Sequence, residues 1–355
     1  MEKKAKIFVA GHRGLVGSAI LKNLQSKGYD NFVLRTFSEL DLTNQAAVSE
    51  FFAAEKPEYV FLAAAHVGGI VANSIYRADF IYLNLQIQNN VIYESWRNGV
   101  KKLLFLGSTC IYPGDAPQPM PENCLLTSPL EYSNEPYAIA KIAGLKMCES
   151  FNLQYNTNYI AVMPTNLYGP NDNFNLEKSH VLPALIRKAH LGKCLIAGDW
   201  KAIRTDFNRY PVEGVDGNAP ESDIVAKLTK FGITAQQITI WGTGTPLREF
   251  LWSEDMADAC VYIMEKVDFK DLRGHSPEVR NSHINIGSGK ELTIKDLATL
   301  ISKEVGYTGD LFFDTTKPDG TLRKLTDPSK LHALGWHHKM EIEQGIHTLY
   351  HWYLG

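Results

Sequence analysis

Short apolar runs alternate with helical patterns through the first half of the chain, and this alternation restricts the possible folds more than any other feature. We expect strands at residues 7–10, 32–34, 59–62, 103–106 and 159–163. We expect helices between them at residues 15–27, 45–55, 82–98 and 137–155. The runs are apolar at every position, as in parallel strands that are buried on both faces. This order predicts βαβ units and an α/β fold with a doubly wound parallel sheet.

The pattern changes after Gly169 and Pro170. Residues 193–237 are rich in Asp, Asn, Gly and Pro, and one helix is expected within them near residues 222–231. Loops of this length without structure are uncommon, so we interpret the segment as an insertion with some structure of its own. Elsewhere in the second half we expect helices at 181–191, 253–267, from 293 and at 342–353, and strands at 238–241 and 284–287.

The length of the chain predicts two domains. It has 355 residues, whereas a single hydrophobic core stops growing at roughly 250–300 residues. We expect residues 1–170 to form the doubly wound domain and residues 171–355 to form a second, smaller mixed α/β domain that carries the insertion. Parts of 238–290 are expected to pack back onto the first domain.

The composition argues against several kinds of partner. The formal net charge is -3, and no dense run of Lys or Arg occurs, so binding to nucleic acid or to an anionic membrane is not expected. The five cysteines are scattered and include no C-x-x-C pair, which predicts neither a disulfide framework nor a metal site. No apolar stretch of signal-peptide or transmembrane length is evident. These features together predict a cytoplasmic protein.

A glycine-rich loop follows the first expected strand and opens the first expected helix. It reads Gly11-His12-Arg13-Gly14-Leu15-Val16-Gly17. Glycines suit this place because the turn is tight and because a pyrophosphate must approach the bare backbone at the N-terminus of a helix. The spacing is one residue looser than the G-x-G-x-x-G fingerprint. In this context the loop predicts a Rossmann-type dinucleotide site.

The end of the second expected strand indicates which dinucleotide is bound. Sites that prefer NAD usually place an acid there to hold the ribose 2′-hydroxyl. This strand instead ends in Arg35, and a second arginine, Arg13, lies in the glycine loop. Two guanidinium groups suit a 2′-phosphate and predict NADP. The alternative is that Arg35 is solvated and that Glu39 or Asp41 reaches the ribose.

Three residues suggest carbonyl chemistry. Tyr137 and Lys141 are four residues apart on an expected helix, so they share a face, and the ammonium group is expected to lower the pKa of the phenol. Ser108 follows the fourth expected strand directly, and catalytic groups collect at the carboxyl ends of such strands. The alternative is a surface tyrosine and a solvated lysine on an ordinary amphipathic helix.

Ser108 completes a Ser, Tyr and Lys set with Tyr137 and Lys141. With this set, the chain resembles the extended short-chain dehydrogenase/reductase family over nearly its whole length. Further segments point to the branch that epimerises C3 and C5 of GDP-4-keto-6-deoxy-D-mannose and reduces its 4-ketone with NADPH to give GDP-L-fucose. These segments are Leu62-Ala63-Ala64-Ala65-His66-Val67-Gly68-Gly69, Gly107-Ser108-Thr109-Cys110-Ile111-Tyr112-Pro113, Pro164-Thr165-Asn166-Leu167-Tyr168-Gly169-Pro170, Trp241-Gly242-Thr243-Gly244-Thr245-Pro246-Leu247-Arg248-Glu249-Phe250 and Lys317-Pro318-Asp319-Gly320.

The resemblance implies a role for each candidate residue. Cys110 and His180 match the proton carriers for the epimerisation, although without the resemblance they would be interpreted as a small core residue and an ordinary helix-start histidine. Tyr137 would protonate the alkoxide, Ser108 would hydrogen-bond to the same oxygen, and Lys141 would hold the nicotinamide ribose. The implied cofactor contacts are Gly11, His12, Arg13, Gly14, Leu15, Val16, Gly17, Arg35, Asp41, Leu42, Leu106, Gly107, Lys141, Pro164, Thr165, Asn166, Leu167 and His180. The implied GDP-sugar contacts are Lys188, Trp241, Arg248 and Asp319.

Some positions depart from the family pattern. Phe37 stands where relatives can carry another arginine, Leu322 replaces a proline, and the insertion precedes Trp241. The rival interpretations are another nucleotide-sugar enzyme, such as a UDP-sugar 4-epimerase that recycles NAD, and a binding module that senses NADP without turnover. The family also suggests a homodimer, for which helices 82–98 and 137–155 are candidates.

Overall fold

The computed structural model describes residues 1–274 and 278–355, without the side chains of Ile70 and Val71. The chain divides into two compact units. Unit 1 comprises Met1–Asn171, Glu249–Lys290 and Leu325–Met340. Unit 2 comprises Asp172–Arg248, Glu291–Lys324 and Glu341–Gly355.

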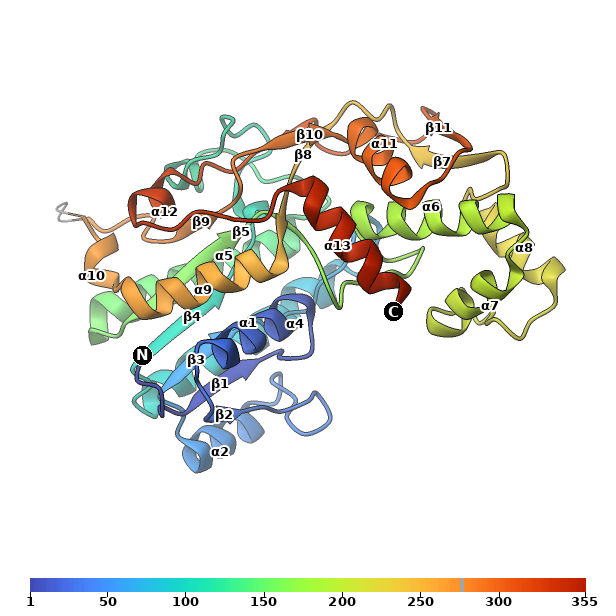
Figure 1. The fold of residues 1–355 in the computed structure, drawn as a ribbon. Helices are drawn as coiled ribbons and strands as arrows, with labels where there is room; N and C mark the ends of the chain where they lie inside the picture. The colour runs from blue at the N-terminus through green and yellow to red at the C-terminus, as the bar shows by residue number, and fades with distance from the viewer. Residues whose placement is uncertain (275–277) are drawn as a thin grey trace. The chain divides into compact units, whose positions relative to one another are not determined.

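A six-stranded parallel sheet forms the centre of unit 1 (Figure 1), with the strand order β2-β1-β3-β4-β5-β9. Its strands are β1 (Ile7–Ala10), β2 (Phe32–Val33), β3 (Tyr59–Leu62), β4 (Lys102–Leu106), β5 (Tyr159–Pro164) and β9 (Ile284–Ile286). Every residue of β1, β3, β4 and β5 is buried. Burial on both faces explains why the sequence shows continuous apolar runs and no alternation.

Helices cover both faces of this sheet. The side chains of α1 (Leu15–Ser26) and α9 (Ser253–Lys266) share one hydrophobic core with one set of strand residues, and those of α2 (Gln45–Glu55), α4 (Arg77–Arg97) and α5 (Glu135–Tyr155) share a second core with the opposite set. This is a doubly wound sheet, so the predicted α/β fold class is confirmed. Unit 1 also holds α3 (Ile70–Ile75), η1 (Thr109–Ile111), η2 (Glu122–Cys124), β6 (Asn166–Tyr168), α10 (Phe269–Leu272) and α12 (Ser329–Ala333).

Unit 1 differs in its boundaries from the predicted domain of residues 1–170. It also takes in Glu249–Lys290 and Leu325–Met340. The reason is that β9 pairs with β5 at the edge of the sheet, α9 packs against α1, and α12 packs against β9. The return of Leu325–Met340 was not predicted, because the segment carries only one short helix and no periodic apolar pattern.

Unit 2 contains a short parallel pair, β7 (Gln237–Trp241) with β11 (Asp310–Asp314). Helix α6 (Val181–Ala197) packs against α11 (Ile294–Val305), which in turn packs against α13 (Ile342–Leu354). Strand β8 (Leu247–Trp252) begins in unit 2, where Leu247 and Arg248 pair with β12 (Arg323–Lys324), and its remaining residues belong to unit 1. Unit 2 also contains β10 (Glu291–Thr293).

The predicted insertion contains two helices, α7 (Trp200–Arg209) and α8 (Glu221–Lys230). Helix α8 confirms the helix expected near residues 222–231, whereas α7 was not predicted. The two helices bury Ile203, Phe207, Ile224 and Leu228 in a hydrophobic cluster with the end of α6. A buried ion pair also holds α7 to α6, since Nη2 of Arg187 lies 2.7 Å from Oδ1 of Asp206.

None of the helices in the described part of the chain is long and apolar enough to cross a lipid bilayer.

Candidate functional site

The glycine loop has the geometry of a phosphate-binding turn. Gly11 has a φ of +84°, and a Cβ atom there would lie 2.8 Å from the backbone nitrogen of Ala64. A Cβ atom on Gly17 would lie 2.1 Å from the carbonyl oxygen of Gly11. Gly14 is the N-cap residue of α1, so it offers no side chain to cap the first N–H groups of the helix. His12 and Arg13 complete the loop, and Leu15 and Val16 begin α1. The loop therefore leaves bare backbone and a helix N-terminus for an anion.

Two arginines act on the same carboxylate beside this loop. Hydrogen bonds from the N–H and the hydroxyl of Thr36 lower the pKa of Glu39, and the charges of Arg35 and Arg13 lower it further. Nη2 of Arg35 also donates to Oε1 of Glu55 over 2.6 Å. The structure thus brings both predicted arginines into one electrostatic environment, which also contains acids. The arginines would bind a 2′-phosphate, and the acids would accept a hydrogen bond from a ribose hydroxyl.

The carboxylate of Asp41 is already hydrogen-bonded to a neighbouring residue. Its Oδ1 atom accepts hydrogen bonds from the backbone N–H of Thr43, over 2.9 Å, and from the Thr43 hydroxyl, over 2.7 Å. The carbonyl of the next predicted contact, Leu42, accepts a hydrogen bond from Asn90 over 2.9 Å. The turn after β2 is therefore held in place by α4.

Replacing Arg35 with alanine tests the assignment of the 2′-phosphate. We expect the KM for NADPH to rise at least about tenfold, since a charge-assisted hydrogen bond contributes roughly 1.5–3 kcal/mol. The KM for NADH should change little. The measurement is initial-rate kinetics with each cofactor, and Arg280→Ala serves as the control, because Arg280 is exposed and paired with Glu278. Equal increases in the KM for NADPH and for NADH would contradict this assignment and would favour Glu39 or Asp41 as the residue that contacts the ribose.

The carboxyl ends of β4 and β5 hold the next group of predicted contacts. Gly107 is packed closely, because a Cβ atom there would lie 2.3 Å from the sulfur of Met163. The backbone N–H of Thr165 donates to the carbonyl of Ile286 over 3.0 Å, and the side chain of Asn166 donates to the carbonyl of Glu249 over 2.9 Å. Pro164 ends β5, and Leu167 pairs with Leu251. These contacts fix the strand ends at which a dinucleotide would lie.

Ser108, Cys110, Tyr137 and Lys141 come together at the end of β4. Ser108 is the N-cap residue of η1, and its hydroxyl accepts a hydrogen bond from the backbone N–H of Cys110 over 3.3 Å. Helix α5 packs against η1, and its Lys141 donates to the carbonyl of Leu106 over 2.9 Å. The ammonium nitrogen lies 5.6 Å from the ring centroid of Tyr137. The Cys110 thiol is also close enough for its charge to affect the pKa values of both Tyr137 and Lys141.

The structure corrects the expected effect of Lys141 on Tyr137. Burial raises the pKa of Tyr137 well above its ordinary value, and the charge of Cys110 adds to this increase. Burial also lowers the pKa of Lys141 to about 8, with the charge of Cys110 opposing the change. Lys141 is only 3% exposed and directs its ammonium group to a carbonyl. Tyr137 is therefore a neutral phenol at pH 7, which is the protonation state that a proton donor needs.

His180 and the predicted substrate contacts belong to unit 2. His180 is the exposed N-cap residue of α6. On the next turns of this helix, Lys188 donates to the carbonyl of Thr239 in β7 over 2.9 Å. Trp241 ends the same strand with 59% of its surface exposed, and Lys317 lies over its ring at 5.6 Å.

Arg248 and Asp319 lie at the glycine turns beside Trp241. Asp319 accepts hydrogen bonds from the backbone and the hydroxyl of Thr243, over 2.9 and 2.8 Å. A Cβ atom on Gly242 would lie 2.2 Å from Asp319, and one on Gly320 would lie 2.9 Å from Arg248. The structure therefore gathers Trp241, Arg248 and Asp319 at one place in unit 2, and β7 connects them to Lys188. Their roles in binding remain predictions.

One polar residue that supports α5 was not predicted from the sequence. The side chain of Gln88 in α4 donates to the carbonyl of Ala140, the residue before Lys141, over 2.6 Å in the buried interior. The two helices approach closely at Gly144, where a Cβ atom would lie 2.4 Å from the ring of Phe105 and 2.9 Å from Gln88. A glycine inside a predicted helix was the available signal for this close approach.

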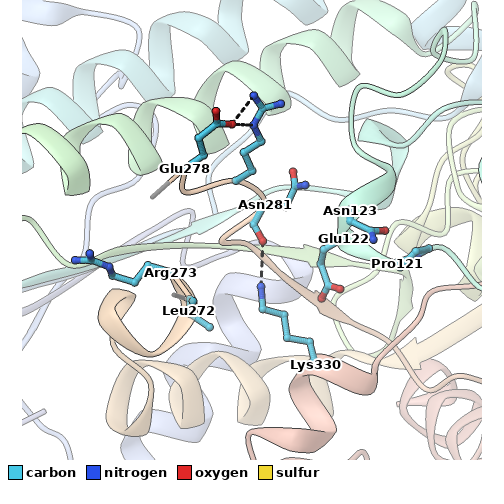
Figure 2. A pocket seen from close by; sticks show the side chains of 10 residues that line it. Pro121, Glu122, Asn123, Leu272, Arg273, Glu278, Asn281 and Lys330 are labelled. Carbon is cyan, nitrogen blue, oxygen red and sulfur yellow. Dashed lines mark hydrogen bonds and ion pairs between the residues drawn. The ribbon is translucent and has the colours of Figure 1, made fainter. Parts of the chain in front are cut away.

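Unit 1 also has a cavity of about 570 Å³ (Figure 2). It contains none of the predicted site residues. Lys330 points toward Asn281 and donates to its carbonyl over 3.1 Å (Figure 2). Its lining residues are Pro121, Glu122, Asn123, Leu272, Arg273, Gly274, Glu278, Arg280, Asn281 and Lys330.

A glycine loop at the start of a doubly wound sheet, together with Ser108, Tyr137 and Lys141 in one unit, defines a class of nucleotide-dependent carbonyl enzymes. The chain belongs to the NAD dependent epimerase/dehydratase family, whose model matches residues 7–207 and 211–287. The family resemblance predicted from the sequence is confirmed.

Three proteins illustrate what the chain is similar to. It is 53% identical to the putative GDP-L-fucose synthase 2 of Arabidopsis thaliana, over 100% of this chain and 93% of that protein. It is 48% identical to the GDP-L-fucose synthase of Escherichia coli K12, over 99% and 97% of the two chains. The solved structure of MlghC, a GDP-mannoheptose C4 reductase from Campylobacter jejuni with NADP bound, is 46% identical, with a TM-score of 0.87 over 99% of each chain.

Proposed function

We propose that the chain is an NADPH-dependent GDP-L-fucose synthase. It epimerises C3 and C5 of GDP-4-keto-6-deoxy-D-mannose and then reduces the 4-ketone. The observation that carries this proposal is that Cys110 lies in η1, directly against helix α5, which carries Tyr137 and Lys141. A simple ketone reductase needs the tyrosine and the lysine but has no use for an additional acid/base. Relatives that share about half of the sequence carry the same name.

The residues present fit NADP. Side chains at Gly11 and Gly17 would fill the turn that a pyrophosphate approaches, and Arg13 and Arg35 supply cations for a 2′-phosphate. When bound, the cofactor supplies the hydride that attacks C4. Lys141 would bind the nicotinamide ribose, as it already lies at the end of β4. NADP in the related heptose reductase supports the same choice.

Epimerisation requires two proton carriers. The 4-ketone acidifies the C–H groups at C3 and C5, so a base removes each proton on one face and an acid returns one on the opposite face. We assign these roles to Cys110 and His180. Tyr137 then gives its proton to the oxygen at C4 as hydride arrives, and Ser108 donates a hydrogen bond to that oxygen.

Isotope labelling tests both half-reactions in one experiment. GDP-4-keto-6-deoxy-D-mannose and NADPH are incubated with the protein in heavy water, and the product is analysed by mass spectrometry. The proposal predicts deuterium at C3 and C5 and protium, delivered from NADPH, at C4. A reduced product without deuterium on carbon would show that the protein reduces the ketone but does not epimerise C3 and C5.

Reduction of a GDP-4-keto-heptose is the second candidate. It is favoured by the 46% identity to MlghC over 99% of both chains. The two candidates are separated by comparing kcat/KM for the 4-keto-6-deoxy-mannose and 4-keto-heptose nucleotides at equal NADPH. A preference for the heptose of more than about tenfold, which corresponds to about 1.4 kcal/mol, would replace the fucose assignment.

We further propose a cytoplasmic location and a homodimer. Five free, buried cysteines suit a reducing compartment. Helices α4 and α5 pack together and expose several apolar side chains, which suits an interface between two copies. These side chains are Tyr82, Tyr93, Ile139, Leu153 and Tyr155.

Light scattering checks the oligomeric state. We expect twice the mass of the chain, and we expect Leu153→Glu to shift the population towards monomer, because a charge cannot be buried unpaired at low cost. Val225→Glu is the matched control, since Val225 is exposed on α8 of unit 2. A monomeric parent chain would contradict the proposal.

A further inference from the structure

Two histidines and a glutamate form a surface cluster in unit 2 that includes none of the residues assigned above. His347 and His351 are four residues apart in α13, so their imidazoles lie on the same side of the helix. Helix α11 packs against α13 and carries Glu304 in its last turn. The fold thus adds a carboxylate to a pair of imidazoles.

The distances suit a metal ion. Nδ1 of His347 lies 2.7 Å from Oε1 of Glu304, and the centroids of the two imidazole rings are 4.4 Å apart. One possible ligand atom from each residue lies within 4.8 Å of the other two. Tetrahedral zinc holds its ligand atoms about 3.3 Å apart, because its bonds to nitrogen and oxygen are about 2.0–2.1 Å long. Small rotations of these three surface side chains would bring the ligand atoms from within 4.8 Å to the separation that zinc requires.

We propose that Glu304, His347 and His351 bind a divalent transition-metal ion, with zinc as the favoured ion and water as the fourth ligand. Two imidazoles with one carboxylate is a known set of protein ligands for zinc with an open position. Both histidines are exposed, so the ion can enter from solvent without rearrangement of the core.

A simple ion pair would account for only part of this arrangement. A protonated His347 beside Glu304 is favourable by itself, and histidines near the C-terminus of a helix interact well with its dipole. The dipole favours His351 in the last turn of α13, but neither effect requires its imidazole to lie close to Glu304 and His347. In the metal site, His351 is a ligand, so this residue distinguishes the two explanations.

A bound ion would connect the exposed side of α13 to α11. The opposite side of α13 is already packed, with Ile346, Leu349, Tyr350 and Tyr353 buried. An ion held by residues from two helices binds only when both helices are formed, and it therefore stabilises the folded state. The expected effect is stabilisation of unit 2, separate from the chemistry assigned to Tyr137 and Cys110.

The cysteine spacing gives no indication of this site, because none of its proposed ligands is a cysteine. The available signal was His347-Thr348-Leu349-Tyr350-His351, two histidines at helical spacing. The third ligand could not be identified from the sequence, because Glu304 lies 43 residues before His347 along the chain.

The test uses the full chain without an affinity tag, after treatment with a chelator and its removal. Zinc chloride is titrated by calorimetry, and cobalt(II) is added separately to record its visible absorption. We expect one zinc per chain and the intense absorption of low-coordinate cobalt. The variants His347→Ala, His351→Ala and Glu304→Gln should each weaken zinc binding at least about tenfold. His337→Ala is the control, since His337 is an exposed histidine that stacks on His332 in another part of the chain.

Thermal unfolding provides a second readout. Zinc at about 100 times its dissociation constant should raise the Tm of the parent chain by at least about 3 °C and should leave that of His351→Ala unchanged. The proposal fails if the parent chain binds no zinc, if His351→Ala binds zinc as well as the parent, or if His337→Ala loses binding to the same extent.

Discussion

Tyr137→Phe is expected to lower the rate of ketone reduction by about 10²–10⁴-fold, the usual contribution of a positioned general acid. Only the phenol oxygen is removed, and the ring can keep its edge-to-face contact with Phe80, whose centroid lies 6.3 Å away. The affinity for NADPH should therefore be unchanged. The measurements are steady-state oxidation of NADPH for turnover and fluorescence titration for cofactor binding.

Tyr132→Phe is the matched control for this prediction. Tyr132 precedes α5 and is 76% exposed, so loss of its hydroxyl should leave turnover at the parent level. Deuterium exchange at C3 and C5 gives a further comparison, because the proposed epimerisation takes its protons from Cys110 and His180. Continued exchange with lost reduction is the expected pattern, and full reduction activity in Tyr137→Phe would remove the assigned role.

The proximity of Tyr137, Lys141 and Ser108 could be predicted from sequence because it depends on local geometry. The i,i+4 spacing places Tyr137 and Lys141 on one turn of α5, and Ser108 must follow β4 whatever the rest of the chain does. Whether the pKa of Tyr137 is raised or lowered could not be predicted from that spacing. It depends on burial from other parts of the chain, since Lys141 is only 3% exposed and is directed to the carbonyl of Leu106.

The central sheet was predictable for a similar reason. Strands β1, β3, β4 and β5 are buried on both faces, and all their residues except Lys102 are apolar, so the pattern is clear. Strand β11 is partly exposed and strand β12 has only 2 residues, and their sequences therefore carry no clear signal. The inclusion of Leu325–Met340 in unit 1 depends on long-range contacts, as does the approach of Glu304 to His347. Neither can be inferred from local periodicity.

Cys110→Ser is expected to lower deuterium incorporation at C3 and C5 by about 10²-fold or more. The backbone N–H of Cys110 is the group that donates to Ser108, and the substitution retains it. Serine is also close to cysteine in size, so the packing around this buried position, which is 6% exposed, should change little. What is lost is the acidity of the thiol, since a hydroxyl does not ionise in the neutral range without strong activation.

Reduction should respond differently from epimerisation in the same variant. Supplied with a substrate that is already epimerised at both carbons, Cys110→Ser should reduce it at a rate within about threefold of the parent chain, because Tyr137 and Lys141 are intact. Cys124→Ser is the control, as Cys124 is a second buried cysteine whose thiol donates to the carbonyl of Pro121 over 3.0 Å. Its hydroxyl replacement can make the same bond. If Cys110→Ser exchanged deuterium at the parent rate, the thiol would be a packing residue and another group would have to carry the proton. Loss of exchange with retained reduction would separate the two reactions within one site and assign the first to Cys110.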